Sequence, residues 1–152
     1  MTTLKMAVPR TLRAEHRELH HELTRAMDAG GRTGEAARRV ADLLHPHFVK
    51  EEEFALPPLA VLAALAKGIP LPDPGGVLER TERLKAEFAQ LVREHDEIVR
   101  ALQALIMTAK ADQKPEIVRF AEQLVLHAET EEEVLYPAAI LVGEYLKLKR
   151  GL

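Results

Sequence analysis

Two segments of the chain repeat one arrangement of side chains that can bind metal ions. Residues 47–57 read HFVKEEEFALP and residues 127–137 read HAETEEEVLYP. The matching residues, each pair 80 positions apart, are His47 with His127, Glu51 with Glu131 and Pro57 with Pro137. A histidine and a glutamate four residues apart lie one turn apart on the same face of a helix. Each segment can therefore offer an imidazole and a carboxylate to one metal ion.

A second pair of histidines precedes these segments. LRAEHREL surrounds His16 and LVREHDEI surrounds His95, 79 residues later. The chain is thus two copies of a two-helix unit, in which the first helix supplies a histidine and the second a histidine and a glutamate. Four imidazoles and two carboxylates predict a site for two metal ions. Because the chain has no cysteine, these ligands suit iron, manganese or zinc.

Helix formers dominate the chain, and no segment has the alternating pattern of a strand. Glycine and proline clusters divide it into helices at about 9–29, 34–66 (kinked at Pro57), 74–108, 114–136 and 137–149. The short loops make neighbouring helices antiparallel. We therefore predict an all-α fold, an up-down-up-down antiparallel four-helix bundle with a short C-terminal extra helix, as a single domain over residues 1–152.

Some residues should set the ends and bends of these helices. Thr33 is a plausible N-cap of the second helix, and Asp73 followed by Pro74 is the expected start of the third. Pro46 should kink the second helix locally, and Pro137 should break the fourth.

The six candidate ligands interrupt stripes of apolar residues that recur every three or four positions. In the fourth helix, for example, the stripe is Ile117, Phe120, Leu124, His127, Glu131 and Val134. Burying a carboxylate without a partner costs several kcal/mol. The alternative is a set of core histidines with acids paired to arginines, but no arginine stands on these stripes. A bound metal explains the pattern better.

These motifs resemble the hemerythrin-like (HHE) domain family over roughly residues 9–145. The residues that carry the resemblance are His16, His47, Glu51, His95, His127 and Glu131, with Pro57 and Tyr136-Pro137 closing the repeats. The resemblance implies a four-helix bundle around two iron ions, bridged by an oxo or hydroxo group and by carboxylates. Manganese or zinc remains an alternative.

The chain also departs from the oxygen-carrying members of that family. Those proteins use five histidines, two of them one turn apart on the third helix, where this chain has Val99 after His95. Their second carboxylate is an aspartate after a longer gap. The pattern here is closer to the four-histidine, two-carboxylate sites of bacterial iron-centre repair proteins and iron-sensing domains. His20, one turn after His16, is a candidate additional ligand.

Several neighbouring residues have less distinctive patterns. His21 and His45 should lie on the surface. We expect the other glutamates near the motifs to form a solvated face, although Glu52 or Glu132 could hydrogen-bond to a ligand histidine; they are Glu15, Glu52, Glu53, Glu94, Glu132 and Glu133. Tyr136 could reach the site, but we expect it to close the core. The apolar residues of the last helix should cap the bundle; they are Ile140, Leu141, Tyr145 and Leu148.

Composition narrows the class of protein. The net charge of −3 and the lack of a basic patch argue against nucleic-acid binding. The most apolar run, residues 56–66, is too short to cross a membrane and contains two prolines. The start of the chain does not read as a signal peptide. We therefore expect a cytoplasmic protein without membrane partners, as a monomer or weak homo-oligomer.

Three functions fit such a centre. The first is binding, sensing or storage of dioxygen or a related small molecule such as nitric oxide. The second is stress defence, by reduction of nitric oxide or peroxide or by donation of iron to damaged iron–sulfur clusters. The third is a regulatory module that responds to iron or oxygen. No acid–base pair is evident and the chain has no serine, so we expect a binding protein rather than an enzyme acting on organic substrates.

Overall fold

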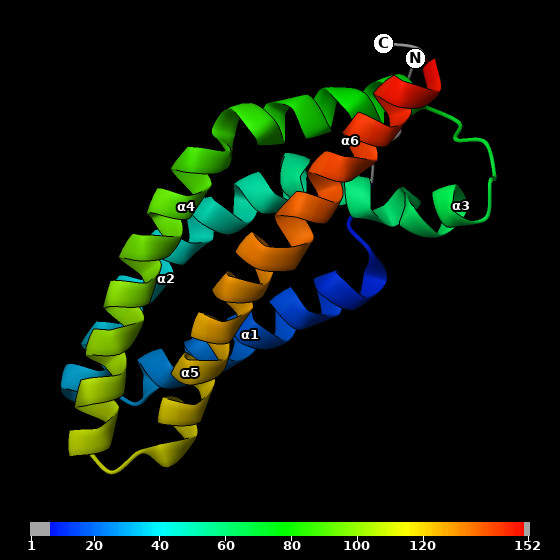
Figure 1. Ribbon diagram of the computed structural model, residues 1–152. Coiled ribbons are helices and arrows are strands. Elements are labelled where there is room, and N and C mark those ends of the chain that lie inside the picture. The colour runs from blue at the N-terminus through cyan, green and yellow to red at the C-terminus, as the bar shows by residue number, and fades with distance from the viewer. Residues whose placement is uncertain (1–6, 151–152) are drawn as a thin grey trace.

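The computed structural model describes residues 7–150, which form a bundle of four long antiparallel helices (Figure 1). The bundle helices are α1 (Arg10–Asp28), α2 (Gly31–Lys50), α4 (Pro74–Ala111) and α5 (Pro115–Thr130), which continues toward α6 (Tyr136–Arg150). Helix α1 packs against α2 and α5, and α4 packs against α2, α5 and α6. No strand occurs between residues 7 and 150. The predicted up-down-up-down bundle with a C-terminal helix is confirmed.

The long connection between α2 and α4 closes one end of the bundle. It contains a π turn (Glu51–Ala55), a 3₁₀ turn (Pro57–Val61) and the short helix α3 (Leu62–Ala66), which projects beside the bundle in Figure 1. Asp73 then caps α4, because its side chain accepts a hydrogen bond from the Gly76 N–H at 3.0 Å. This cap, with Pro74 in the first turn, is as predicted.

The start of α2 differs from the prediction. The residue before the helix is Gly30, which has a φ of 70°, a backbone conformation that favours glycine. Thr33 is therefore not the N-cap. It is buried inside the first turn, and its hydroxyl donates to Asp112 Oδ2 at 2.6 Å. This bond joins the first turn of α2 to the α4–α5 loop at the far end of the bundle. Helix α2 then continues through Pro46 without interruption.

Each of the two repeated segments contains a π turn that begins at its glutamate. The N–H of Leu56 donates to the Glu51 carbonyl at 2.8 Å, and the N–H of Tyr136 donates to the Glu131 carbonyl. Proline has no N–H, and its ring crowds the carbonyl of the preceding turn. A wider turn ahead of Pro57 and Pro137 eases that conflict. The prediction that Pro137 breaks the fourth helix is therefore wrong, because α5 runs through the π turn into α6.

The second π turn also shifts which residues face inward. A regular helix would place Val134 on the inner stripe after Glu131, but Val134 is 54% exposed. The extra residue in the turn brings Tyr136, five positions after Glu131, to the inner face instead, where it is fully buried. The expected stripe is thus wrong at Val134, and the π turn delivers a phenol to the middle of the bundle.

Two apolar layers enclose the middle of the bundle. One packs side chains of α1, α2, α4 and α5, including Leu19, Leu44 and Leu124. The other packs the π and 3₁₀ segments against α4 and α6, including Phe54, Leu84 and Tyr136. The candidate ligands lie between these layers, so they are shielded from water at both ends of the bundle.

Helix α6 meets the bundle through a different face from the one expected. Its buried residues are Tyr136, Ala139, Val142, Gly143 and Leu146. Gly143 permits close contact with α4, because a Cβ there would lie 2.1 Å from Thr81 Oγ1. Leu141, Tyr145 and Leu148 are exposed, so the prediction that they cap the bundle is wrong. Only Ile140 of that set is partly buried.

Candidate metal centre

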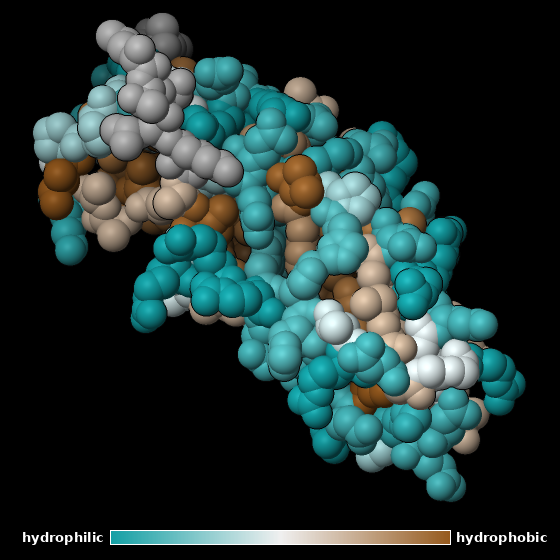
Figure 2. All heavy atoms as spheres, turned by 180° about the vertical axis from the view of Figure 1, so that it is seen from behind, coloured by the Kyte–Doolittle hydropathy of each residue, from teal (hydrophilic) through white to brown (hydrophobic). Residues whose placement is uncertain are grey.

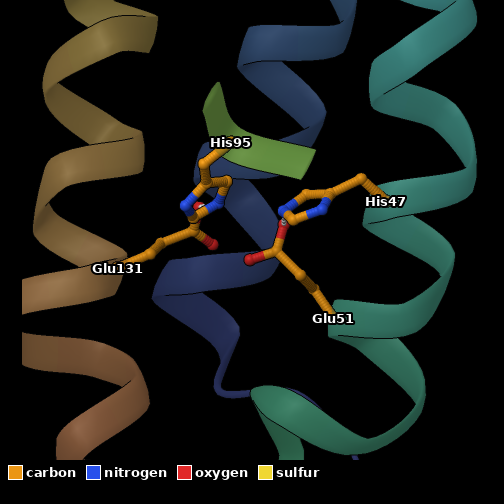
Figure 3. A group of neighbouring side chains, drawn as sticks. All are labelled: His47, Glu51, His95 and Glu131. Carbon is orange, nitrogen blue, oxygen red and sulfur yellow. Dashed lines mark ion pairs between the residues drawn. The ribbon is translucent and has the colours of Figure 1, made fainter. Parts of the chain in front are cut away.

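Six ionisable side chains from all four bundle helices meet between the two apolar layers. They are His16 of α1, His47 of α2, Glu51 of the first π turn, His95 of α4, His127 of α5 and Glu131 of the second π turn. None is more than 7% exposed. Figure 3 shows four of them, His47, Glu51, His95 and Glu131, pointing toward one another. These are the six residues that the apolar stripes singled out.

The six residues form two groups that could each hold one metal ion. His47, Glu51, His95 and Glu131 make one group, and His16, His127 and Glu131 make the other; within each group the ligand atoms lie within 4.8 Å of one another. Glu131 belongs to both. Its Oε1 lies 3.2 Å from His95 Nε2, and its Oε2 lies 3.6 Å from His127 Nε2. A single carboxylate therefore faces both candidate metal positions.

Glu51 is placed differently from Glu131, although the two match in the repeat. Its Oε1 lies 3.3 Å from His47 Nε2. Its Oε2 accepts a hydrogen bond from the Tyr136 hydroxyl at 2.9 Å. The same hydroxyl lies 3.3 Å from the Nε2 atoms of His47 and His95. Tyr136 thus lies at the centre and not only in the core, contrary to the expectation from sequence.

The phenol makes the two candidate metal positions chemically unequal. The residue that matches Tyr136 in the first repeat is Leu56, which is buried and apolar. On the other side, the His16 ring stacks on Phe48, with 4.1 Å between ring centroids. The residue that matches Phe48 is Ala128. One position therefore has a hydroxyl group beside it, and the other has an aromatic wall.

A ring of outer glutamates surrounds the histidines. His47 Nδ1 donates to Glu94 Oε1 at 2.9 Å, His95 Nδ1 donates to Glu132 Oε1 at 2.9 Å, and His127 Nδ1 donates to Glu15. Glu52 Oε1 lies 3.6 Å from His16 Nδ1, which is too long for a hydrogen bond. Each glutamate comes from the next helix around the bundle. The expectation that Glu15 and Glu94 lie on a solvated face is wrong. Of the two glutamates named as possible partners of a ligand histidine, Glu132 makes the hydrogen bond and Glu52 does not.

These outer contacts orient the imidazoles toward the middle of the site. A histidine whose Nδ1–H is held by a carboxylate presents the lone pair of Nε2, and the carboxylate makes that nitrogen a better ligand. Sequence reasoning named Glu132 as a possible partner of a histidine but missed Glu15 and Glu94. The available signal was positional: one pair directly precedes the ligand histidines and the other directly follows the ligand glutamates, in both repeats. Glu53 and Glu133 have no such contact and are exposed.

Burial and mutual contact shift several pKa values at the centre. Burial lowers the pKa of His16 and of His95, and the charge of His47 lowers that of His95 further. Burial also opposes protonation of His47, but Glu51 and Glu94 raise its pKa overall. Burial alone would raise the pKa of Glu51, yet its contacts with His47 lower it. The centre therefore holds anionic Glu51 and readily presents neutral His16 and His95.

Unpartnered polar atoms show that these residues fit a cation. Among residues 7–150, five buried side-chain atoms have no hydrogen-bond partner: His16 Nδ1 and Nε2, Glu51 Oε1, His127 Nε2 and Glu131 Oε2. Leaving such atoms buried and unpaired is costly. Four of the five are lone-pair positions that face the two groups, and a positive ion between them would satisfy those four together. The nitrogen and oxygen donors, without sulfur, match first-row transition metals.

Comparison with protein families agrees with this geometry. The model of the hemerythrin HHE cation-binding domain matches residues 7–139, most of the chain. The chain belongs to the hemerythrin HHE family. A search of curated proteins and a search of solved structures found no match. In addition, no helix between residues 7 and 150 is long and apolar enough to cross a membrane.

The HHE domain of this chain does not bring His20 to the centre. His20 is exposed, belongs to neither ligand group, and packs beside His45 with 4.5 Å between ring centroids. The geometry places six residues around the two positions, and the proposed additional ligand points elsewhere. His21 and His45 are exposed, as expected.

Removing one member of the outer ring should weaken metal binding by the HHE domain. We expect Glu132→Gln, which loses the charge that holds His95 Nδ1, to lower metal affinity about 10- to 100-fold. Isothermal titration of the metal-free protein with Fe²⁺ under anaerobic conditions measures this. Glu133→Gln is the matched control, because Glu133 is the adjacent exposed glutamate. Equal affinities in the two variants would contradict a role for the outer ring.

Proposed function

We propose that this HHE domain holds two iron ions at the six-residue centre and reversibly binds dioxygen there. His47, Glu51 and His95 would hold one ion, His16 and His127 the other, and Glu131 would serve both. Iron at such a site would supply reversible electron transfer to a small bound molecule. Family membership and the unpartnered donor atoms support the metal part of the proposal.

The position of Tyr136 carries the dioxygen part of the proposal. Its hydroxyl lies against the group formed by His47, Glu51, His95 and Glu131. Burial and the neighbouring carboxylates raise its pKa far above the usual range, so it stays protonated and keeps its O–H donor. That O–H, which donates to Glu51 Oε2 at 2.9 Å, could turn to a small electron-rich molecule held beside it.

The same features favour binding over turnover. Reducing nitric oxide or peroxide consumes protons, which must be delivered by groups whose pKa lies near neutrality. Tyr136 holds its proton tightly, and three of the four outer glutamates are engaged by histidines. The apolar layers close the two ends of the centre. An oxygen-binding role therefore fits these surroundings better than a reductase role.

Metal analysis combined with optical spectroscopy tests the proposal. We expect about two irons per chain by elemental analysis, which follows from the two ligand groups. The reduced, anaerobic protein should develop a new visible absorption band on exposure to dioxygen. Removing dioxygen under argon should reverse that band over several cycles.

Other outcomes would point to a different function. Irreversible oxidation by the first dose of dioxygen would contradict reversible binding. Multiple turnovers of nitric oxide or peroxide, or transfer of iron to an apo iron–sulfur protein, would support the stress-defence alternative instead. A single zinc ion per chain would overturn the two-iron centre itself.

A further inference from the structure

Two surface pockets lie outside the centre, one against each of a pair of matching histidines. The pocket beside His16, between α1 and α2, has a volume of about 660 Å³; its rim includes Arg13, Arg17, His20, His21 and His45. The pocket beside His95, between α4 and α5, has about 470 Å³ and includes Asp96, Arg100, Glu129 and Glu132. Figure 2 looks onto the α1–α2 side, whose surface is mostly hydrophilic.

The repeat relates the two pockets, but their charges are opposite. Arg17 of the first pocket matches Asp96 of the second, and Val49 matches Glu129. The pocket at His16 has two arginines and one glutamate, whereas the pocket at His95 has three carboxylates and one arginine. Duplicated pockets that differ in this way are suited to ligands of opposite sign.

The arginines of the first pocket are arranged to act together. Arg13 and Arg17 are four residues apart, and thus one turn apart on one face of α1. Neither forms an ion pair with a carboxylate within residues 7–150. Guanidinium groups bind carboxylates and other oxyanions through paired N–H donors.

A buried donor of this pocket also lacks a partner. His16 is 4% exposed and lines the pocket, yet its Nδ1 has no hydrogen bond. At the matching place His95 Nδ1 donates to Glu132 at 2.9 Å, whereas Glu52 stays 3.6 Å from His16 Nδ1 with its side chain 54% exposed. The pocket at His16 therefore contains a donor, His16 Nδ1, for which Glu52 is too distant to act as acceptor.

We propose that the pocket at His16 binds a small oxyanion, a carboxylate or its inorganic equivalent. The anion would pair with Arg13 and Arg17 and accept a hydrogen bond from His16 Nδ1, in place of Glu52. This is a site separate from the metal centre and goes beyond the proposed function. It would couple a surface ligand to one of the two metal positions through the opposite nitrogen of the same imidazole.

Apolar residues in the same pocket would also accept an anion that carries an apolar group. Phe48 and Val49 form part of the pocket beside the cationic rim, so an oxyanion carried on a small apolar group would bury surface there. The exposed pair of His20 and His45 could instead bind a transition metal. The two arginines oppose a cation in the same pocket, which favours the anion.

Calorimetric titration of the purified protein with sodium formate, inorganic phosphate and sodium benzoate tests the site, at constant ionic strength in a buffer without oxyanions. We expect saturable binding of one anion per chain. Phosphate binding at least as tightly as the two carboxylates indicates an inorganic ligand. Benzoate binding more tightly than formate and phosphate indicates a carboxylate carried on an apolar group. Either ranking supports the oxyanion site. Repeating the titration on Glu131→Gln protein, which should lack the metals, separates this site from the centre, because binding should persist there.

Matched variants decide whether the named residues form the site. Arg17→Asp, which copies the charge of the opposite pocket, should weaken binding at least tenfold. Glu52→Gln should strengthen it several-fold, since a competing carboxylate is lost. Arg100→Gln in the opposite pocket should change nothing. No saturable binding, equal affinity in wild type and Arg17→Asp, or binding of Zn²⁺ without any anion would overturn the proposal.

Discussion

Replacing Glu131 by glutamine should empty both metal positions at once. The two oxygens of Glu131 lie near different histidines, Oε1 near His95 and Oε2 near His127, and it is the one residue shared by the two ligand groups. The amide keeps the shape but loses the charge, so each ion loses an anionic ligand. We expect affinity to fall by more than about 100-fold at both positions, the upper range for outer contacts alone. Elemental analysis of the desalted protein measures the loss.

The contrast with His16→Gln makes this prediction specific to a shared carboxylate. His16 belongs only to the group with His127 and Glu131, so its loss should release one metal and leave the other. The control Glu129→Gln changes an exposed glutamate two residues from Glu131 and should keep both. If Glu131→Gln loses only one metal, or if His16→Gln loses two, the two-group description is wrong.

Misfolding would not explain the loss in Glu131→Gln. A buried carboxylate without its metal is unfavourable, and glutamine keeps the shape of that side chain without its charge. The metal-free variant should therefore remain helical by circular dichroism. Its unfolding midpoint should match that of metal-free wild type or exceed it.

The sequence was sufficient to locate the six central residues because they obey simple helical spacing. His95 and His16 stand where leucines would continue an apolar stripe, and a regular helix carries that stripe straight to the partner helices. The same residues recur in both repeats, which argues against a chance arrangement. The four-helix topology follows from the same stripes and from short loops, which leave few ways to bury them.

The departures came where the backbone leaves regular spacing or where contacts run between helices. A π turn adds one residue to a helical turn, and this moved Tyr136 to the centre in place of Val134. No periodicity in the sequence reports such a turn. The contacts of Glu94 with His47, and of Glu15 with His127, join different helices, so they depend on how the helices are rotated and not on spacing within either one.

Removing the metals should lower the thermal midpoint of the protein by about 10–20 °C. A ligand present at about 100 times its dissociation constant stabilises the folded state by about 2.7 kcal/mol. Two such ions add about 5 kcal/mol, and a domain of this size shifts by about 2–4 °C per kcal/mol. Calorimetric melting before and after anaerobic chelation measures the difference. Chelation of Glu131→Gln protein, which should hold no metal, is the control and should leave its midpoint unchanged.

Acidification should reduce the difference in thermal midpoint between metal-loaded and metal-free protein. Metal ligation requires neutral imidazoles, and the raised pKa of His47, caused by Glu51 and Glu94 against the effect of burial, makes a proton compete there first. In metal-free protein the protonated His47 contributes stability below the unfolded pKa of about 6.5, and this is lost as pH rises through its higher folded pKa. The pKa values of His16 and His95 are lowered, so protonating these two residues destabilises the metal-free protein as the pH falls. The two effects oppose each other, and the thermal midpoint of the metal-free protein should change little with pH. A difference between the two forms that widens on acidification would mean that these histidines do not bind the metal.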